Sequence, residues 1–179
     1  PMNYIEHGLD ATPEMVIYKK LNEVQNWVVQ SAYIQQGQSL ALNLTNGVGA
    51  NNATGFFDNT STSIGVRSNF AISRDDPYIA YAFHSVDGYS KIGSYVGTGA
   101  AGNTVVTGFR PAFVMIKQSS NIGTDNHWNM WDNKRVEYDM LRADTSDSEF
   151  AGSLTRINFL NNGFQMMDSD TSRNTNGGS

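Results

Sequence analysis

Apolar residues along this chain fall in short runs of strand length, separated by residues that favour turns. Clear runs lie at residues 15–18, Tyr78–Phe83 and Phe113–Ile116. Glycine, aspartate and asparagine lie between the runs, for example at residues 87–88 and 161–163. This pattern predicts many short strands with frequent turns. We therefore expect an all-β fold, an antiparallel β-sandwich of jelly-roll type.

The run Tyr78–Phe83 carries apolar side chains on both faces of the predicted strand. A strand of this kind is typical of the middle of a sheet, where both faces are covered. The pattern therefore predicts a buried central strand. The best helical candidate, residues 14–30, contains several β-branched residues, which favour strands instead.

One pattern of residues occurs twice in the chain, about a hundred residues apart. A glycine and a proline precede an apolar run that ends at a lysine, and a tryptophan follows after a polar loop. These residues are Gly8, Pro13, Lys19 and Trp27 in the first copy, and Gly108, Pro111, Lys117 and Trp128 in the second. Self-similarity of this kind indicates duplicated structural units. We expect two tandem repeats, residues 1–88 and 89–179.

The two copies also differ at their outer ends. The first copy has almost nothing before Gly8, whereas the second is preceded by residues 90–97. The second copy has no counterpart of Tyr78–Phe83 after its last polar stretch. We therefore expect the first repeat to be truncated at its N-terminal side and the second at its C-terminal side.

The composition provides enough apolar residues for a packed core, since 39% of the 179 residues are hydrophobic. The net charge is −5, so no nucleic-acid partner is expected, because such binding needs a basic surface. The chain has no cysteine, which excludes disulfides and thiolate metal sites. No apolar run approaches the roughly 18 residues of a membrane helix. We expect a soluble protein without a membrane partner.

Two segments match enzyme motifs in part. Residues 97–102 have the G-x-G-x-x-G spacing of dinucleotide-binding loops, but β-prone residues follow where that motif needs a helix. We therefore expect an exposed, flexible hairpin loop without phosphate. Residues 137–142 are similar to a jelly-roll glucanase signature, but Arg142 replaces the second of the two required carboxylic acids. The three histidines have no metal-ligand spacing. These observations predict that the protein is not an enzyme.

Acidic turns are the only candidates for a bound ion. Asp168 and Asp170 are separated by one serine, and Asp75 and Asp76 are adjacent. Carboxylate oxygens are ligands that calcium prefers, but neither pair fits the EF-hand pattern. We therefore expect no metal site and no cofactor, with calcium at these turns as the alternative.

The stretch 127–135 provides the candidate ligand-binding site. Alternate side chains of a strand share a face, so Trp128 and Trp131 should point to opposite sides. Trp128 corresponds to Trp27, and we assign both to the core. Trp131 would then lie on the surface, where it could stack on a sugar ring; packing between the two copies is the alternative. The candidate site residues are Trp131, Asp132, Asn133 and Arg135.

The segments 78–95, 108–117 and 132–135 together resemble a repeat found in marine phage tail-fibre-like and virion structural proteins. Such proteins are similar to concanavalin A-like lectin domains. The resemblance covers most of the chain and is closest in these segments. It implies a β-sandwich and a virion-associated role, and it supplies no catalytic residues.

These observations lead to one expected function and one alternative. We expect a non-enzymatic structural and adhesion module of a phage tail fibre or surface fibre, located on the virion or outside the cell. Its partners would be other virion subunits or copies of itself in a homo-oligomer, together with a host-surface glycan. The alternative is a carbohydrate-binding module of a bacterial surface protein or enzyme.

Overall fold

The computed structural model describes residues 2–49, 58–67, 76–120, 126–135, 139–151 and 154–178. These residues form twelve strands and one helix of four residues, and the strands pair in antiparallel sheets. The predicted all-β, antiparallel class is therefore confirmed. Among the described residues, no helix has the length and apolar character needed to cross a membrane.

The chain divides into two compact units. The first comprises Pro1–Leu42 and Val48–Ser85, and the second comprises Asn43–Gly47 and Val86–Ser179. The main division therefore lies between Ser85 and Val86, and the sequence placed it after residue 88.

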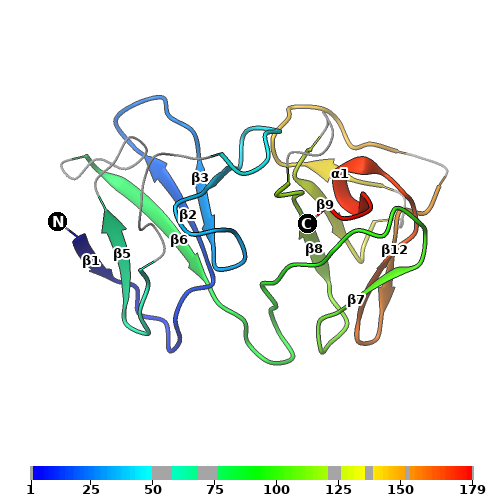
Figure 1. Ribbon diagram of the computed structural model, residues 1–179, viewed down its shortest axis with the longest axis horizontal. Coiled ribbons are helices and arrows are strands. Elements are labelled where there is room, and N and C mark those ends of the chain that lie inside the picture. Colours follow the sequence, from blue (N-terminus) through cyan, green and yellow to red (C-terminus); the bar gives the residue numbers. More distant parts are fainter. Residues whose placement is uncertain are drawn as a thin grey trace. The chain divides into compact units, whose positions relative to one another are not determined.

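Two sheets form the first unit (Figure 1). One pairs β1 (Met2–Glu6) with β5 (Ser63–Arg67), and the other has the order β4 (Leu40–Ala41), β3 (Val28–Ser31), β2 (Met15–Lys20), β6 (Tyr78–Phe83). Val16, Tyr18 and Val28 from the larger sheet pack with Ile64 of β5. The two sheets thus share a core, as in a sandwich.

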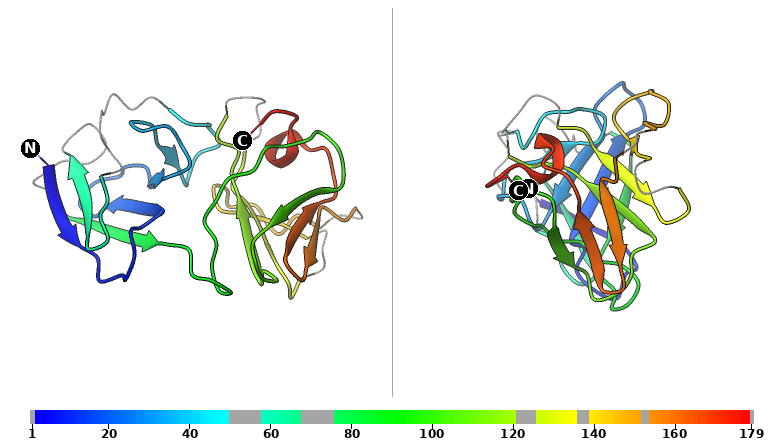
Figure 2. Two further views of the ribbon diagram at one scale, coloured as in Figure 1. Left: turned by 60° about the horizontal axis from the view of Figure 1, so that its bottom comes forward. Right: turned by 90° about the vertical axis from the view of Figure 1, so that its right-hand side faces the viewer.

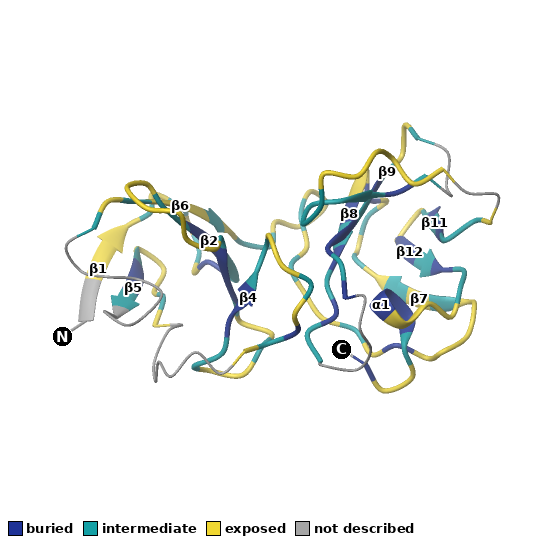
Figure 3. Cartoon of the chain, turned by 90° about the horizontal axis from the view of Figure 1, so that it is seen from above, coloured by how far each residue is buried: buried dark blue, intermediate teal, exposed yellow. Residues whose placement is uncertain are grey.

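Strand β6 differs from its prediction. It lies at one edge of its sheet, and β2 is its only neighbour among the described strands. Ile79, Tyr81 and Phe83 are exposed. Figure 3 shows β6 in the colours of exposed and intermediate residues. The prediction of a buried central strand is therefore wrong. Of its two apolar faces, the one with Ala82 and Tyr78 packs on the core and the other faces outward.

Two three-stranded sheets form the second unit. Their orders are β10 (Leu141–Arg142), β9 (Asn129–Asp132), β8 (Phe113–Ile116), and β11 (Ile157–Leu160), β12 (Gly163–Met166), β7 (Asn103–Val106). Figure 2 shows the green β7 beside the orange β12. Eight buried side chains from both sheets and from the loop before β10 form the core: Val114, Ile116, Trp131, Met140, Ile157, Phe159, Phe164 and Met166.

The glycine-rich loop of the second unit leads directly into β7. The prediction that no helix follows residues 97–102 is therefore confirmed, and most of the loop is exposed. Gly97, however, is buried. A Cβ atom at this position would collide with the carbonyl oxygen of Thr175, and Gly97 exchanges backbone hydrogen bonds with Gly177 and Gly178. The glycine permits a close approach of two chain segments, which a flexible hairpin tip would not need.

Candidate functional site

The outward face of the larger sheet in the first unit gathers one lysine and two aromatic side chains. Lys19 lies near the end of β2, Trp27 directly precedes β3, and Tyr81 lies in the middle of β6. Val16 and Tyr18 point into the core, so the alternation of β2 turns Lys19 outward. Three neighbouring strands thus bring Lys19, Trp27 and Tyr81 together, and we call these three residues the aromatic face.

The rings of the aromatic face are stacked. The centroids of Trp27 and Tyr81 are 6.4 Å apart, with 23° between the ring planes. The Nζ atom of Lys19 lies 5.9 Å from the centroid of the Trp27 ring and donates a hydrogen bond of 2.7 Å to the backbone oxygen of Gln25. A lysine over an indole ring is an attractive cation–π arrangement. The lysine is thereby held beside the rings.

Solvent reaches the aromatic face. Tyr81 is 43% exposed and Trp27 is half-buried. The assignment of Trp27 to the core is therefore wrong, because its ring packs against an outward residue of the edge strand β6. Ile79 and Phe83, which flank Tyr81 on the same side of β6, are also exposed. Flat rings with a polar atom at the edge can contact both the apolar faces and the hydroxyls of a ligand.

The structure does not place Trp131 at a surface site. Its side chain is 2% exposed and belongs to the core cluster of the second unit. Trp128 is also buried, as predicted. The predicted exposure of Trp131 is therefore wrong. The guanidinium carbon of Arg173 lies 5.9 Å from the Trp131 ring centroid. A residue of the C-terminal helix thus covers the ring that was expected to be exposed to solvent.

The other three candidate residues form a closed turn. The carboxylate of Asp132 accepts hydrogen bonds from the backbone N–H groups of Lys134 and Arg135, which lower its pKa. Arg135 forms ion pairs with Asp132 at 2.9 Å and with Glu149 at 2.8 Å. Asn133 is exposed. The structure thus brings Asp132, Asn133 and Arg135 together, but Trp131, the aromatic residue predicted to lie with them, is buried in the core.

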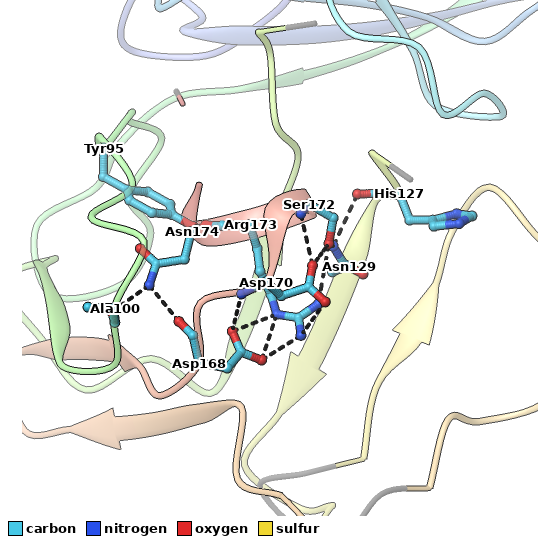
Figure 4. A network of polar contacts seen from close by, with 9 residues as sticks. All are labelled: Tyr95, Ala100, His127, Asn129, Asp168, Asp170, Ser172, Arg173 and Asn174. Atoms are coloured by element: carbon cyan, nitrogen blue, oxygen red, sulfur yellow. Dashed lines mark hydrogen bonds and ion pairs between the residues drawn. The ribbon is translucent and has the colours of Figure 1, made fainter. Parts of the chain in front are cut away.

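Arg173 is the centre of a polar network in the second unit (Figure 4). Its Nη2 atom lies 2.5 Å from Asp168 and 3.2 Å from Asp170. Its backbone oxygen accepts a hydrogen bond from the hydroxyl of Tyr95. Burial of Asp170 opposes its ionisation, but the hydrogen bonds from Ser172 and the charge of Arg173 outweigh this and lower its pKa. The network holds α1 (Thr171–Asn174) against the core.

Asn174 fastens the glycine-rich loop to the same helix. Its amide nitrogen donates to the backbone oxygens of Ala100 and Asp168, and its amide oxygen accepts from Thr98 and Asn103. All four hydrogen-bonding positions of the side chain are therefore used. The role is structural, because the amide has no capacity left for a ligand.

The acidic turns considered as alternative calcium sites have basic partners in the structure. Both Asp168 and Asp170 contact the guanidinium of Arg173, which supplies the positive charge that a metal would otherwise bring. Asp76 forms an ion pair with Lys20, and Asp75 lies outside the described residues. Within the described ranges, no group of three or more potential metal-binding side chains is found.

A histidine and an aspartate form a buried pair in the second unit. His127 Nδ1 lies 2.7 Å from Asp144 Oδ2, and Asp144 Oδ1 accepts a hydrogen bond of 3.0 Å from the backbone N–H of Trp128. Both oxygens of this carboxylate thus hold the chain at the start of β9. Of the glucanase-like stretch, residues 137–138 lie outside the described part of the chain.

Sequence reasoning missed Tyr81, Lys19 and Arg173 as members of these clusters. The repeat had drawn attention to Lys19 and Trp27, but only the strand order shows that β6 supplies Tyr81 beside them. Arg173 is far from Trp131 in the sequence, and no local pattern links the two. A lone arginine in a polar stretch gives no signal of burial.

Comparison with known proteins gives one family. A family model described as a domain of unknown function, DUF7483, matches residues 2–179. No curated protein and no solved structure matches the chain.

Proposed function

The chain belongs to the DUF7483 family of domains of unknown function, and on this premise we propose that it is a non-enzymatic adhesion module that contacts glycans through the aromatic face. The observation that carries the proposal is the stacked, solvent-accessible pair of Trp27 and Tyr81 with Lys19 beside it. Aromatic rings stack on the C–H faces of sugars, and a lysine donates to sugar hydroxyls or pairs with an acidic sugar.

The proposal includes two tandem repeats of jelly-roll sandwich type. The strand register supports it. Val16 of β2 lies opposite Gln30 of β3, and Val114 of β8 lies opposite Trp131 of β9. The residue pairs that follow along both ladders keep this offset, and the prolines that precede β2 and β8, Pro13 and Pro111, are both buried. β1 pairs with β5 as β7 pairs with β12.

A repeated module suits adhesion, because linked weak contacts reinforce one another through effective concentration. The resemblance of residues 78–95, 108–117 and 132–135 to repeats of phage tail-fibre-like proteins supports a location on a virion or another extracellular fibre. Its partners there would be other fibre subunits and a glycan of the host surface.

A glycan array tests the proposal. The unmodified chain should bind a defined set of glycans, and Trp27→Ala and Tyr81→Ala should each lose that binding while keeping the circular dichroism spectrum of the folded protein. Tyr89→Ala is the matched control, because Tyr89 is an exposed tyrosine outside the aromatic face. Absence of any glycan binding, or equal binding by the Trp27→Ala protein, would contradict the proposal.

A second candidate function is a purely structural contact within a fibre. The exposed row of Ile79, Tyr81 and Phe83 on an edge strand favours it, because such rows are typical of protein interfaces. Sedimentation at increasing concentration distinguishes the two candidates. A fibre contact predicts association that Ile79→Ser and Phe83→Ser weaken, with no effect of added glycan.

A further inference from the structure

We infer that the free edge of β8 in the second unit is an acceptor for an added β-strand with the side-chain alternation of Tyr78–Phe83. The inference goes beyond glycan contact, and it rests on the repeat equivalence proposed above. β2 has a strand on each side, β3 and β6. Its counterpart β8 has, among the described strands, one neighbour, β9.

A free edge leaves backbone N–H and C=O groups without strand partners, and such edges accept extended segments. On β2, the strand β6 forms a six-residue antiparallel ladder, from Met15 opposite Phe83 to Lys20 opposite Tyr78. The same register on β8 would set the incoming strand against residues 113–118. The first unit therefore provides a template for the length, direction and register of the added strand.

One side chain at β8 fits an absent neighbour. Phe113 is 56% exposed, whereas Met15, its counterpart, has Phe83 of β6 beside it. Gln118, just beyond the end of β8, is already covered, because Gly178 of the C-terminal segment lies against its amide. A strand in the β6 register would therefore cover Phe113 at the start of β8.

The template also defines the chemistry of the incoming strand. Ala82 and Tyr78 of β6 pack against the core of the first unit, and Ala80 lies on the same side of the strand but is exposed. Across β8, the same side is occupied by Val114 and Ile116, which are already buried. In the register of β6, Ala82 and Ala80 lie opposite the counterparts of Val114 and Ile116. Small residues therefore fit at these two inward positions, and large apolar residues fit at the outward positions.

The test is a binding measurement with a fluorescent peptide of residues 76–85, carrying two added lysines for solubility, and the full 179-residue chain. We expect saturable binding with one peptide per chain, and slowed hydrogen exchange at the amides of residues 113–118. A scrambled peptide of the same composition should bind at least about tenfold more weakly, because it cannot keep the alternation. Phe113→Ser should weaken binding, and Val106→Ser, at an exposed position of β7, is the matched control.

The outcomes are distinct. No saturable binding, equal binding of the scrambled peptide, or protection on β2 in place of β8 would overturn the inference. Self-association of the chain that the peptide dissociates would support it, because a second copy would then occupy the same edge. Glycan binding does not enter this measurement, so a failure of the glycan proposal would leave this result unaffected, and the reverse also holds.

Discussion

Gln30 and Trp131 occupy corresponding positions in the two units, each opposite a buried valine of the neighbouring strand. Both side chains are almost inaccessible, at 1% and 2%. Gln30 has no hydrogen-bond partner for either amide atom within the described residues, whereas Trp131 belongs to an eight-residue core beneath Arg173. The same strand register thus places a buried glutamine in one unit and a tryptophan at the core of the other.

This difference shows that strand register and core composition are separable. The strand ladder determines that a side chain points inward, but the neighbouring sheets and loops determine how much that side chain contributes to stability. Trp131 buries a large apolar surface, and its indole N–H has no hydrogen-bond partner within the described residues. Gln30 buries two polar atoms with little apolar gain, so the first unit should be the less stable of the two at this position.

The largest expected effect is that of Trp131→Ala. Removal of the ring should lower the free energy of unfolding of the second unit by about 3–5 kcal/mol, because a cavity is left in the core. Trp27→Ala, at the half-buried counterpart of Trp128, should cost much less. Urea unfolding followed by circular dichroism measures both. Equal losses would mean that the two units do not differ as the burial of their tryptophans indicates.

The next effect concerns the buried arginine. Arg173→Met should cost about 3 kcal/mol, because Asp168 and Asp170 then lose the partner of their charges; their partial exposure keeps the loss at the lower end of the range for buried pairs. Arg135→Met is the matched control. Arg135 also pairs with two carboxylates, but at the surface, and its loss should cost at most about 1 kcal/mol. Similar losses in the two variants would contradict a stabilising role of the network.

A gain is expected in the first unit. Gln30→Met keeps the length of the side chain and removes two unpartnered polar atoms, so stability should rise by about 1 kcal/mol. Gln165→Met is the control, because the amide of Gln165 donates to Gly102 and Thr104, and its replacement should bring no gain. A stability loss in Gln30→Met would show that the amide is partnered in solution.

A further effect is a dependence on pH. Burial lowers the pKa of Lys117 to about 8 from the ordinary value of 10.5, and the charge of Asp144 offsets this only in part. Between these values the unfolded chain binds more protons than the folded one, so stability should rise with pH. Lys117→Gln should remove this rise. Unfolding curves from about pH 7.5 to about pH 9.5 measure it, below the range in which tyrosines of the unfolded chain titrate.

The class of fold and the central residues of strands β2, β6 and β8 could be predicted from the sequence, because apolar runs bounded by turn residues mark strands clearly. The sequence did not show which side chains are buried. Alternation shows that Trp128 and Trp131 lie on opposite faces, but both faces are covered, one of them by Arg173. Likewise, β6 carries apolar residues on both faces and still lies at an edge. Long-range packing decides these points, and no local pattern records it.

The backbone bonds of Gly97 have a consequence for how the protein is made. Gly97 donates to the carbonyl oxygen of Gly178 and accepts from the N–H of Gly177, and Gly99 donates to Asn174. Gly97 and its partners lie some eighty residues apart in the chain, so the ribosome synthesises Gly178 last among them. The first unit, whose last strand ends at Phe83, can close while the second is still being translated. The nascent second unit therefore keeps its loop 97–102 unanchored until residues 174–178 emerge.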